Sequence, residues 1–422
     1  MHILYNIGIS FLSIFIKILS PFGSEKFKFF VKGRDGLLQK IEDDLDNYHN
    51  RLDEKDAEES NLIWFHCSSM GEFEQARPVI ERFKENEPNT KIVLTFFSPS
   101  GYEIRKNYDK ADWVYYLPID TPSNARQFIK AIKPQKVFFT KYDLWYNHIM
   151  AAKKWGSKIY LISAIFRNNQ PFFKWWGGFF RKMLKQFDII FVQDTQSVKN
   201  LNSIGIKENV FVAGDTRFDR VVRIASNSGD YKEIKDFKGD YFTIVAGSTW
   251  SPDENILRNV MERLDNIKLI IAPHEVNPER IEKVEQTFKQ FGVVRYSNIA
   301  KEKGKEGERV LLIDCIGILS ALYKYANFSY IGGGFGIGIH NTLEAAVYGS
   351  PIAFGPKYQK FNEAINLIGN GGAVSIENSD QLYSIVNKCF TDRDICTNIG
   401  HNSLQYVNSQ VGATDIIMNK IG

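Results

Sequence analysis

The chain has 422 residues, a length that suits two or three domains better than one. Its 53 lysines and arginines outnumber its 49 acids by only four, an excess too small to indicate a nucleic-acid-binding protein. A hydrophobic fraction of 44% without low-complexity tracts is typical of a folded globular protein. The four cysteines show neither metal-ligand nor disulfide spacing, so we expect reduced, inert thiols at Cys67, Cys315, Cys389 and Cys396.

Residues 1–22 are expected to form a membrane anchor. The run from Ile3 to Leu19 is almost entirely apolar and has about the minimum length that crosses a bilayer as a helix. No signal-peptide cleavage site follows it. Lys28 and Lys32 come soon after the run, so the rest of the chain should lie on the cytoplasmic side. The segment either spans the bilayer or lies in its interface.

The first half of the chain alternates short apolar runs with helical patterns, as a parallel sheet with helical crossovers does. We predict strands at 61–67, 91–97, 135–141, 158–165, 189–193 and 210–214. Predicted helices between them cover 72–86, 123–132 and 144–155.

A polar stretch at 225–230 interrupts this alternation, which resumes at residue 242. We predict strands at 242–248, 268–273, 310–314, 327–332 and 351–355, with helices at 253–264, 278–290, 340–348 and 361–369. The expected fold is α/β, with two Rossmann-like domains (23–225 and 226–422) that face each other across a cleft. The helices after about residue 380 can pack on either half. Ligands of such sheets bind beyond the carboxyl ends of the strands.

The first informative turn joins a strand to a helix and reads His66-Cys-Ser-Ser-Met-Gly-Glu72. Glu72 falls in the first helical turn and is expected to face the cleft, where a carboxylate can act as general base toward an acceptor hydroxyl. An acid at this position also complements the helix dipole, and spacing alone favours that structural role.

The second turn, between residues 332 and 344, reads GGGFGIGIHNTLE and lies between a strand and a helix predicted to start near Asn341. Glycines leave backbone amides unobstructed, and a helix amino terminus favours anions. Five glycines within seven residues favour ligand binding over packing, for example binding of a donor's phosphate or carboxylate. Other turns at strand ends of the same domain are 246–249, 273–275, 355–357 and 361–362.

A basic, aromatic stretch covers residues 167–187 and contains no acid. Six of its apolar residues fall on one helical stripe: Phe172, Trp176, Phe179, Phe180, Met183 and Phe187. Gly177 and Gly178 weaken the helix. The composition favours a membrane interface, and a core-facing helix with a solvated basic face is the alternative.

These turns resemble those of the 3-deoxy-D-manno-octulosonic acid (Kdo) transferase family over nearly the whole chain. The family's Gly-Arg-x-Gly matches residues 33–36, and its Trp-x-His-x-x-Ser-x-Gly-Glu matches residues 64–72. Further matches are Thr-x-x-x-Pro-x-Gly at 95–101, Leu-Pro-x-Asp at 117–120, GDTRFD at 214–219 and the glycine-rich turn with His340-Asn-Thr-Leu-Glu344. Gly355-Pro356 and Phe361-Asn362 follow in the family's order.

The resemblance implies a GT-B glycosyltransferase that moves Kdo from CMP-Kdo to a lipid A precursor with inversion, without a metal or cofactor, at the cytoplasmic face of the inner membrane. It assigns the base role to Glu72. The implied donor-binding residues are Ser248, Thr249, His274, Gly332, Gly333, Gly334, His340, Asn341, Glu344, Gly355, Pro356 and Asn362. The expected acceptor-binding or membrane-binding residues are Arg34, Ser69, Lys141, Asp143, Phe172, Trp175, Trp176, Phe179, Arg181 and Lys182.

Two departures mark a divergent branch. The family's Glu-x-Glu-x-Trp-Pro-Asn reads KYDLWYN at 141–147, and its Pro-Arg-His reads Pro273-His-Glu275, which lacks the arginine. Lys357, Arg217 or Lys141 is a hypothetical replacement for that charge. The rival functions are a UDP-sugar lipid glycosyltransferase, a nucleotide-sugar epimerase and a noncatalytic lipid-binding membrane protein.

Overall fold

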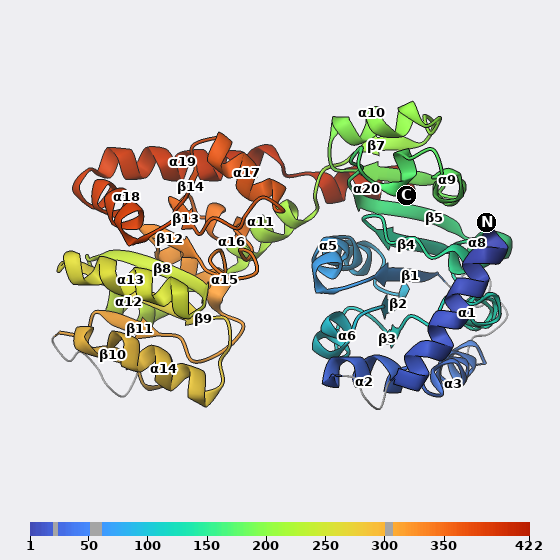
Figure 1. The fold of residues 1–422 in the computed structure, drawn as a ribbon, viewed down its shortest axis with the longest axis horizontal. Coiled ribbons are helices and arrows are strands. Elements are labelled where there is room, and N and C mark those ends of the chain that lie inside the picture. The colour runs from blue at the N-terminus through green and yellow to red at the C-terminus, as the bar shows by residue number, and fades with distance from the viewer. Residues whose placement is uncertain (20–23, 51–60, 300–306) are drawn as a thin grey trace. The chain divides into compact units, whose positions relative to one another are not determined.

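The computed structural model describes residues 1–19, 24–50, 61–299 and 307–422. The chain divides into two compact units (Figure 1). Unit 1 contains Met1–Asp219 together with Gly412–Gly422, and unit 2 contains Arg220–Val411. The division falls near the start of α11 (Arg217–Asn227), a few residues before the boundary predicted from the polar stretch.

Unit 1 is built on a parallel seven-stranded sheet in the order β3-β2-β1-β4-β5-β6-β7. Its strands are β1 (Leu62–Cys67), β2 (Lys91–Phe96), β3 (Trp113–Tyr116), β4 (Lys136–Thr140), β5 (Lys158–Ala164), β6 (Ile189–Val192) and β7 (Val210–Val212). Every residue of β1 is buried, because helices cover both faces of the sheet.

The helices of unit 1 are α1 (His2–Leu19), α2 (Glu25–Lys32), α3 (Leu37–His49), α5 (Met70–Asn86), α6 (Pro99–Arg105), α7 (Pro122–Ile132), α8 (Tyr146–Trp155), α9 (Gly178–Leu184), α10 (Thr195–Ser203) and α20 (Ala413–Ile421). Side chains alternate between the two faces of a strand. Trp64 accordingly joins a core with α3 and α7, whereas Phe65 joins a second core with α5 and α20.

Unit 2 repeats the architecture, with a parallel sheet in the order β10-β11-β9-β8-β12-β13-β14. Its strands are β8 (Phe242–Thr249), β9 (Ile267–Pro273), β10 (Val293–Arg295), β11 (Val310–Leu312), β12 (Phe328–Ile331), β13 (Ile352–Phe354) and β14 (Ala373–Ser375). Its helices are α12 (Lys232–Lys238), α13 (Ser251–Arg263), α14 (Pro278–Phe288), α15 (Leu319–Leu322), α16 (Leu343–Ala346), α17 (Asn362–Gly369), α18 (Ser379–Thr391) and α19 (Arg393–Ser409).

The prediction of an α/β fold with two Rossmann-like halves is confirmed, and every predicted strand overlaps an observed one. Three strands were missed: β3, β10 and β14. Each has only three or four residues, which is short for a sequence pattern to indicate, and each pairs with a neighbouring strand of its sheet. The helix predicted at 340–348 is wrong in length, because α16 has only four residues.

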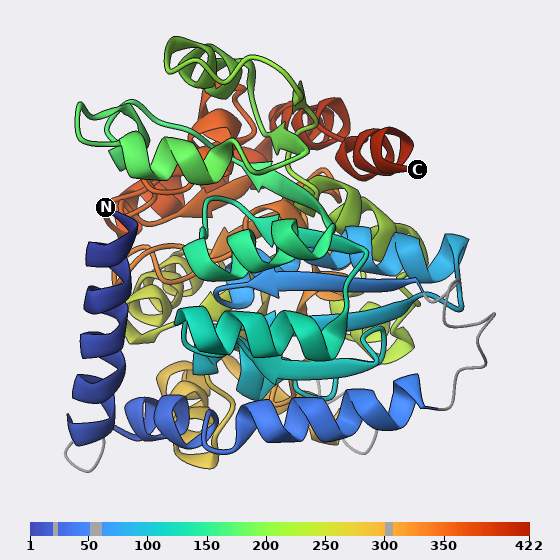
Figure 2. The same ribbon diagram turned by 90° about the vertical axis from the view of Figure 1, so that its right-hand side faces the viewer.

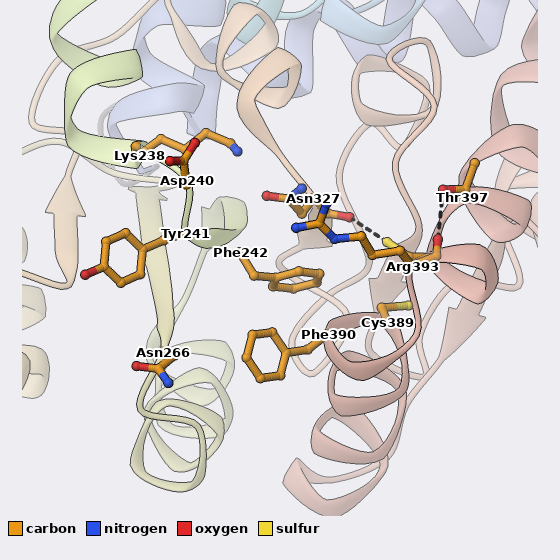
Figure 3. Close-up of a pocket in the computed structure, with 12 residues that line it drawn as sticks. Lys238, Asp240, Tyr241, Phe242, Asn266, Asn327, Cys389, Phe390, Arg393 and Thr397 are labelled. Carbon is orange, nitrogen blue, oxygen red and sulfur yellow. Dashed lines mark hydrogen bonds between the residues drawn. The ribbon is translucent and has the colours of Figure 1, made fainter.

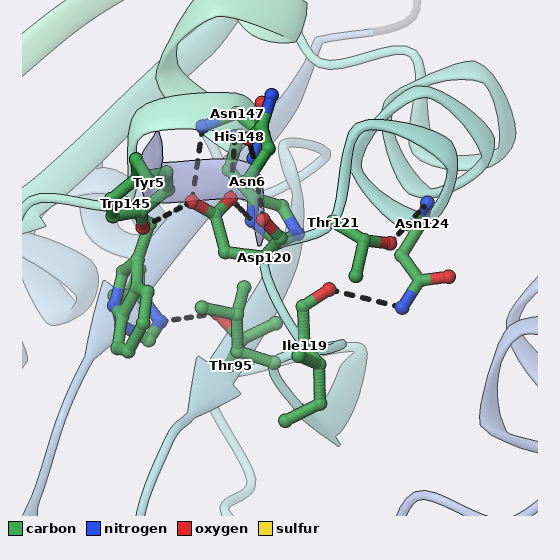
Figure 4. A network of polar contacts seen from close by, with 12 residues as sticks. Tyr5, Asn6, Thr95, Ile119, Asp120, Thr121, Asn124, Trp145, Asn147 and His148 are labelled. Atoms are coloured by element: carbon green, nitrogen blue, oxygen red, sulfur yellow. Dashed lines mark hydrogen bonds and ion pairs between the residues drawn. The ribbon is translucent and has the colours of Figure 1, made fainter. Parts of the chain in front are cut away.

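The buried carboxylate of Asp120 connects α1 to the rest of unit 1 (Figure 4). Asp120 accepts hydrogen bonds from the Tyr5 hydroxyl at 2.6 Å and from the Asn147 and His148 amides at 3.0 and 2.9 Å. The Asn147 side chain also donates to Asn6 of α1. Because Asp120 satisfies the first amides of α8 as a cap does, one side chain both starts α8 and holds the amino-terminal helix.

The described part of the expected anchor segment, residues 1–19, contains the helix α1, which exposes many apolar side chains. Ten large apolar side chains of the segment are exposed: Met1, Ile3, Leu4, Ile7, Phe11, Leu12, Ile14, Phe15, Ile18 and Leu19. Among the helices within the described ranges, none is long and apolar enough to cross a membrane. The interfacial form of the anchor stays a prediction.

The chain returns to unit 1 through α20, which packs on α5. Asp219 accepts hydrogen bonds from the amides of Gly412 and Thr414 and from the Thr414 hydroxyl, each at 2.6 Å. The last residue of the GDTRFD motif therefore caps the helix that closes the core of unit 1.

Replacing Asp219 with alanine should loosen α20. Loss of the cap should cost about 1–2 kcal/mol, so the α20 amides should exchange with solvent roughly ten times faster or more. Asp415→Ala is the matched control, because Asp415 lies on the same helix and its ion pair with Arg82 is exposed. Equal exchange in the two variants, measured by hydrogen–deuterium exchange, would contradict the capping role.

Candidate functional site

The strand order reverses near the middle of each sheet, between β1 and β4 in unit 1 and between β8 and β12 in unit 2. Crossovers from such neighbouring strands leave on opposite faces, so their carboxyl-end loops separate and leave room for a ligand. In unit 1 these loops carry Ser68–Glu72 and Lys141–Trp145. In unit 2 they carry Ser248–Trp250 and Gly332–His340.

A buried histidine connects the two loops of unit 1. His66 lies at the end of β1, with Nε2 2.8 Å from Asp143 and Nδ1 2.9 Å from the Thr95 hydroxyl. Ser68 and the Trp145 indole also donate to the Asp143 carboxylate. Although burial alone would raise the pKa of Asp143, the hydrogen bond and charge of His66 and the other donors hold it below its ordinary value. Asp143 is thus a carboxylate that locks the β4 loop onto β1.

Glu72 lies beside this network in the first turn of α5. One carboxylate oxygen accepts a hydrogen bond from Ser69, the residue that caps the helix, and the other lies 3.3 Å from the Lys141 ammonium. The Glu72 side chain is 17% exposed to solvent. Each carboxylate oxygen has a second lone-pair direction, so these contacts orient Glu72 and leave it able to accept a proton.

Lys141 departs from the family's acidic residue, and its backbone is unusual. It adopts a left-handed conformation with φ of 61° directly after β4, which costs energy in a residue with a Cβ. That conformation accompanies the ion pair between Lys141 and Glu72. The predicted residues Ser69, Lys141 and Asp143 are therefore brought together around Glu72.

Arg34, predicted to contact acceptor or membrane, instead has an internal role. Its guanidinium donates to the carbonyls of Leu117, Phe30 and Phe97 at 2.8–2.9 Å. It also lies 3.9 Å from the Phe30 ring centroid. These bonds fix the turn between α2 and α3 against the ends of β2 and β3, so the assignment of Arg34 to acceptor binding is corrected.

The basic aromatic stretch is not one helix. It contains the short 3-10 helix Pro171–Phe173 and then α9, with Gly177 packed too closely against the Pro171 carbonyl to tolerate a Cβ. Phe172 and Phe179 are buried in the core of unit 1, which corrects their predicted interfacial role. The core-facing alternative holds for these two residues, because their side chains lie among the buried residues of the unit 1 core.

Three of the other predicted site residues in this stretch face solvent. Trp175 is 92% exposed and Trp176 45%, and Lys182 is exposed on α9. Arg181 donates to the carbonyls of Phe172 and Lys174 and so shapes the loop that carries the two tryptophans. This loop adjoins the first turns of α1, where Tyr5 packs against Phe179 at 5.3 Å between ring centroids (Figure 2).

In unit 2, close packing explains most glycines of the 332–338 turn. A Cβ on Gly332 would collide with the Ser248 backbone, and one on Gly334 with the Gly355 backbone. Gly333 and Gly338 have φ of 91° and 144°. Only Gly336, which is exposed, meets neither constraint. The prediction that these glycines are too many for packing is therefore wrong, although they still form a backbone-lined surface.

One carboxylate, not assigned from the sequence, organises this turn. Asp253 of α13 accepts hydrogen bonds from the Gly333 amide at 3.0 Å, the Trp250 amide at 2.9 Å and the Tyr330 hydroxyl at 2.8 Å. Burial raises its pKa in spite of these donors. Asp253 thereby joins the ends of β8 and β12 across the switch point. Its position as an acid in the first turn of a helix was the only sequence signal.

Two predicted donor residues stack at the same edge. The His274 ring lies 4.4 Å from His340 and 4.9 Å from Trp250, centroid to centroid, with interplanar angles of 24° and 30°. Burial, followed by the charge of His274, lowers the pKa of His340 from 6.5 to about 4. The stack brings together the ends of β8, β9 and β12 and presents neutral imidazole at His340.

The remaining predicted donor residues lie on the adjoining loops. Asn341 donates to Glu344 and accepts from the Leu343 amide, so it closes the short turn before α16. Because α16 is a single turn, the helix-dipole argument for anion binding does not apply there. Thr249 is buried and donates to Glu254, and Ser248 has a positive φ of 53°. Pro356 and Asn362 lie on the segment after β13.

Three cations were considered as replacements for the missing arginine, and of these Lys357 lies at the glycine-rich turn. Lys141 is paired with Glu72, and Arg217 with Asp215 at 2.7 Å. Lys357 is exposed and donates to the Gly336 carbonyl at 2.6 Å. Sequence reasoning also missed Arg280, a buried partner of Glu254 whose Nη1 has no hydrogen-bond partner within the described part of the chain.

A separate hollow of about 720 Å³ lies at the opposite, amino-terminal end of the same sheet (Figure 3). Residues before β8, β9 and β12 line it, together with the junction of α18 and α19. It contains none of the predicted donor residues, so the hollow and the switch-point edge are distinct places on unit 2.

Comparisons with known proteins agree with the site in unit 1. Residues 43–220, which carry Glu72 and its neighbours, match the family model described as 3-deoxy-D-manno-octulosonic-acid transferase (kdotransferase). A Kdo transferase of Aquifex aeolicus is 29% identical over 76% of this chain and 83% of its own length. One of Chlamydia muridarum is 26% identical over 78% of each chain.

A bifunctional glycosyltransferase/methyltransferase of Fusobacterium nucleatum is 27% identical over 97% of this chain, which spans 63% of that protein's length. Among solved structures, UDP-GlcNAc 2-epimerase of Neisseria meningitidis superposes with a TM-score of 0.59, at 15% identity over 86% of this chain and 99% of the other. A putative UDP-N-acetylglucosamine 2-epimerase of Listeria monocytogenes gives 0.57, at 15% identity over 86% and 96%. The structures show a GT-B-like fold. The match of residues 43–220 to the family model and the relatives at 26–29% identity over most of the chain support the Kdo transferase family.

Proposed function

We propose that this protein transfers Kdo from CMP-Kdo to a lipid A precursor, lipid IVA, in lipopolysaccharide core biosynthesis. The observation that carries the proposal is the oriented carboxylate of Glu72, held by Ser69 and Lys141 at the switch point of a domain that matches the Kdo transferase model. The relatives' printed activity supports the donor sugar.

In the proposed reaction Glu72 takes the proton of the acceptor hydroxyl as that oxygen attacks the anomeric carbon of Kdo. The bond from that carbon to the phosphate of CMP breaks on the opposite side, so the configuration inverts. Lys141 orients the carboxylate through its ion pair, and the His66–Asp143 network holds the loop that carries Lys141. We propose no metal ion or cofactor in this step.

The donor would bind at the switch-point edge of unit 2. The turn after β12 offers backbone groups close to the stacked rings of His274, His340 and Trp250. Aromatic and imidazole faces suit a nucleobase, and nearby amides suit a phosphate or carboxylate. Lys357 is our candidate for the charge that the missing arginine would supply.

Unit 1 would bind the acceptor and contact the membrane. The exposed apolar face of α1 and the exposed Trp175 and Trp176 come from neighbouring segments, joined through Tyr5 and Phe179. We propose that these side chains seat in the lipid interface at the cytoplasmic face of the inner membrane, with Lys182 available to anionic headgroups.

Glu72→Gln should abolish most Kdo transfer to lipid IVA in detergent. Loss of a general base lowers kcat by about a hundredfold to ten-thousandfold, while CMP-Kdo binding by unit 2 should persist. Glu85→Gln is the matched control, since Glu85 is on the same helix, half exposed and paired with Arg82. Transfer is followed by mass spectrometry of the lipid product, with and without EDTA.

The rival functions are outcomes of the same assay. A wild type that neither binds CMP-Kdo nor transfers Kdo, but binds a UDP-sugar, would indicate a UDP-sugar lipid glycosyltransferase or an epimerase. A wild type that binds lipid but leaves CMP-Kdo intact would indicate a noncatalytic protein. Full activity of Glu72→Gln would remove Glu72 from the base role while leaving the reaction itself in place.

His340 should remain neutral at pH 7. Its folded pKa of about 4 lies below the 6.5 of an exposed histidine, so acid favours the unfolded chain as the pH falls from 6.5 toward 4. Histidine-ring NMR, assigned with His340→Gln, should show titration near pH 4, and the variant should lose less stability in that window. Titration near 6.5 in the folded wild type would contradict the buried stack.

The interfacial proposal for α1 predicts loss of vesicle binding in Phe11→Asp/Phe15→Asp. Both rings are mostly exposed, at 72% and 59%, so the change should leave the fold intact. Burying such a ring is worth about 1.5–3 kcal/mol, so affinity for anionic vesicles should fall at least roughly tenfold. Ile316→Asp is the control, because Ile316 is 84% exposed on unit 2. Unchanged flotation of the double variant would refute the proposal.

A further inference from the structure

Two cysteine thiols meet at the amino-terminal end of the unit 2 sheet. Cys389 lies in the last turn of α18 and Cys396 in the first turns of α19, and both side chains line one hollow. Cys396 also donates to the Asn327 carbonyl at 3.4 Å. The expectation of unrelated, inert thiols therefore does not describe this pair.

Both thiols line the hollow of about 720 Å³ that opens there. Cys389 is 1% exposed and Cys396 is partly exposed, so a small reagent that enters the hollow meets Cys396 first. Arg393 lines the same hollow and extends toward Asn327 (Figure 3). Cys67, by contrast, is buried inside the core of unit 1.

The two thiols are not equivalent. Cys396 is the fourth residue of a 17-residue helix, near the positive end of its dipole, whereas Cys389 lies near the negative end of α18. The hydrogen bond from Cys389 lowers the pKa of Cys396, and the same hydrogen bond, together with burial, raises the pKa of Cys389. Cys396 is therefore the thiol that ionises and attacks, and Cys389 stays protonated beside it.

We propose that Cys396 and Cys389 form an oxidation site that accepts a hydroperoxide and closes to a disulfide. The Cys396 thiolate attacks the peroxide oxygen, the O–O bond breaks, and Cys396 sulfenic acid and hydroxide form. The Cys389 sulfur then attacks the Cys396 sulfur, and the sulfenic oxygen leaves as water with the Cys389 proton. Two thiols are oxidised and one peroxide is reduced to two waters.

The disulfide would join α18 to α19 across the turn at Asp392. Closing it requires the two sulfurs to reach a bond length of about 2.05 Å. This site is independent of the proposed Kdo transfer, because neither thiol lies at the switch-point edge. Transient, regulatory disulfides of this kind are the type found in reducing compartments.

The test uses the full chain with Cys315→Ser, which removes the other partly exposed thiol. Hydrogen peroxide should lower the intact mass by about 2 Da, and peptide mapping should place the disulfide between residues 389 and 396, reversible with dithiothreitol. Adding Cys389→Ser should stop the reaction at a sulfenic acid on Cys396, trapped by dimedone. Adding Cys396→Ser should slow oxidation of Cys389 at least roughly tenfold.

The same oxidation carried out in urea shows how fast Cys389 and Cys396 form a disulfide when only their closeness along the sequence brings them together. The folded chain should form the disulfide at least roughly tenfold faster than the unfolded chain, because the fold holds the two thiols in contact. Equal rates, absence of the disulfide, or equal oxidation of the two serine variants would overturn the proposal. Circular dichroism confirms that each variant is folded, and oxidation in a folded variant is the only result counted.

Discussion

The arrangement of both candidate sites depends on one constraint, the reversal of strand order within each parallel sheet. Where β1 meets β4, and where β8 meets β12, adjacent strands send their crossovers to opposite faces. The loops at these two points therefore separate, and side chains placed on them can reach a ligand without disturbing the core. Glu72 follows β1 and the glycine-rich turn follows β12, so each lies beside the switch point of its own unit.

The two units hold their loops with buried carboxylates that differ in electrostatics. Asp143 is surrounded by His66, Ser68 and Trp145, and these partners lower its pKa although burial would raise it. Asp253 receives mainly neutral backbone and hydroxyl donors, and burial raises its pKa. Each carboxylate thus fixes a loop beside the switch point of its unit, one with a charged partner and the other with neutral donors.

Buried parallel strands were predictable because helices on both faces require continuous apolar runs, as β1 illustrates. The role of Glu72 came from the family resemblance, since a single helical acid carries too little information. Local sequence could not show that Gly332 and Gly334 are required by neighbouring backbone, or that Phe179 faces the core. The contact of Cys389 with Cys396 depends on a turn between two helices, and their spacing does not reveal it.

Hydrogen–deuterium exchange of the full chain, with and without CMP, tests most directly the proposal that the donor binds at the switch-point edge of unit 2. We predict protection of residues 248–250 and 332–340, with little change at 238–242 and 389–397, which line or adjoin the hollow at the other end of the sheet. Protection confined to the hollow, with none at the glycine-rich turn, would contradict the account.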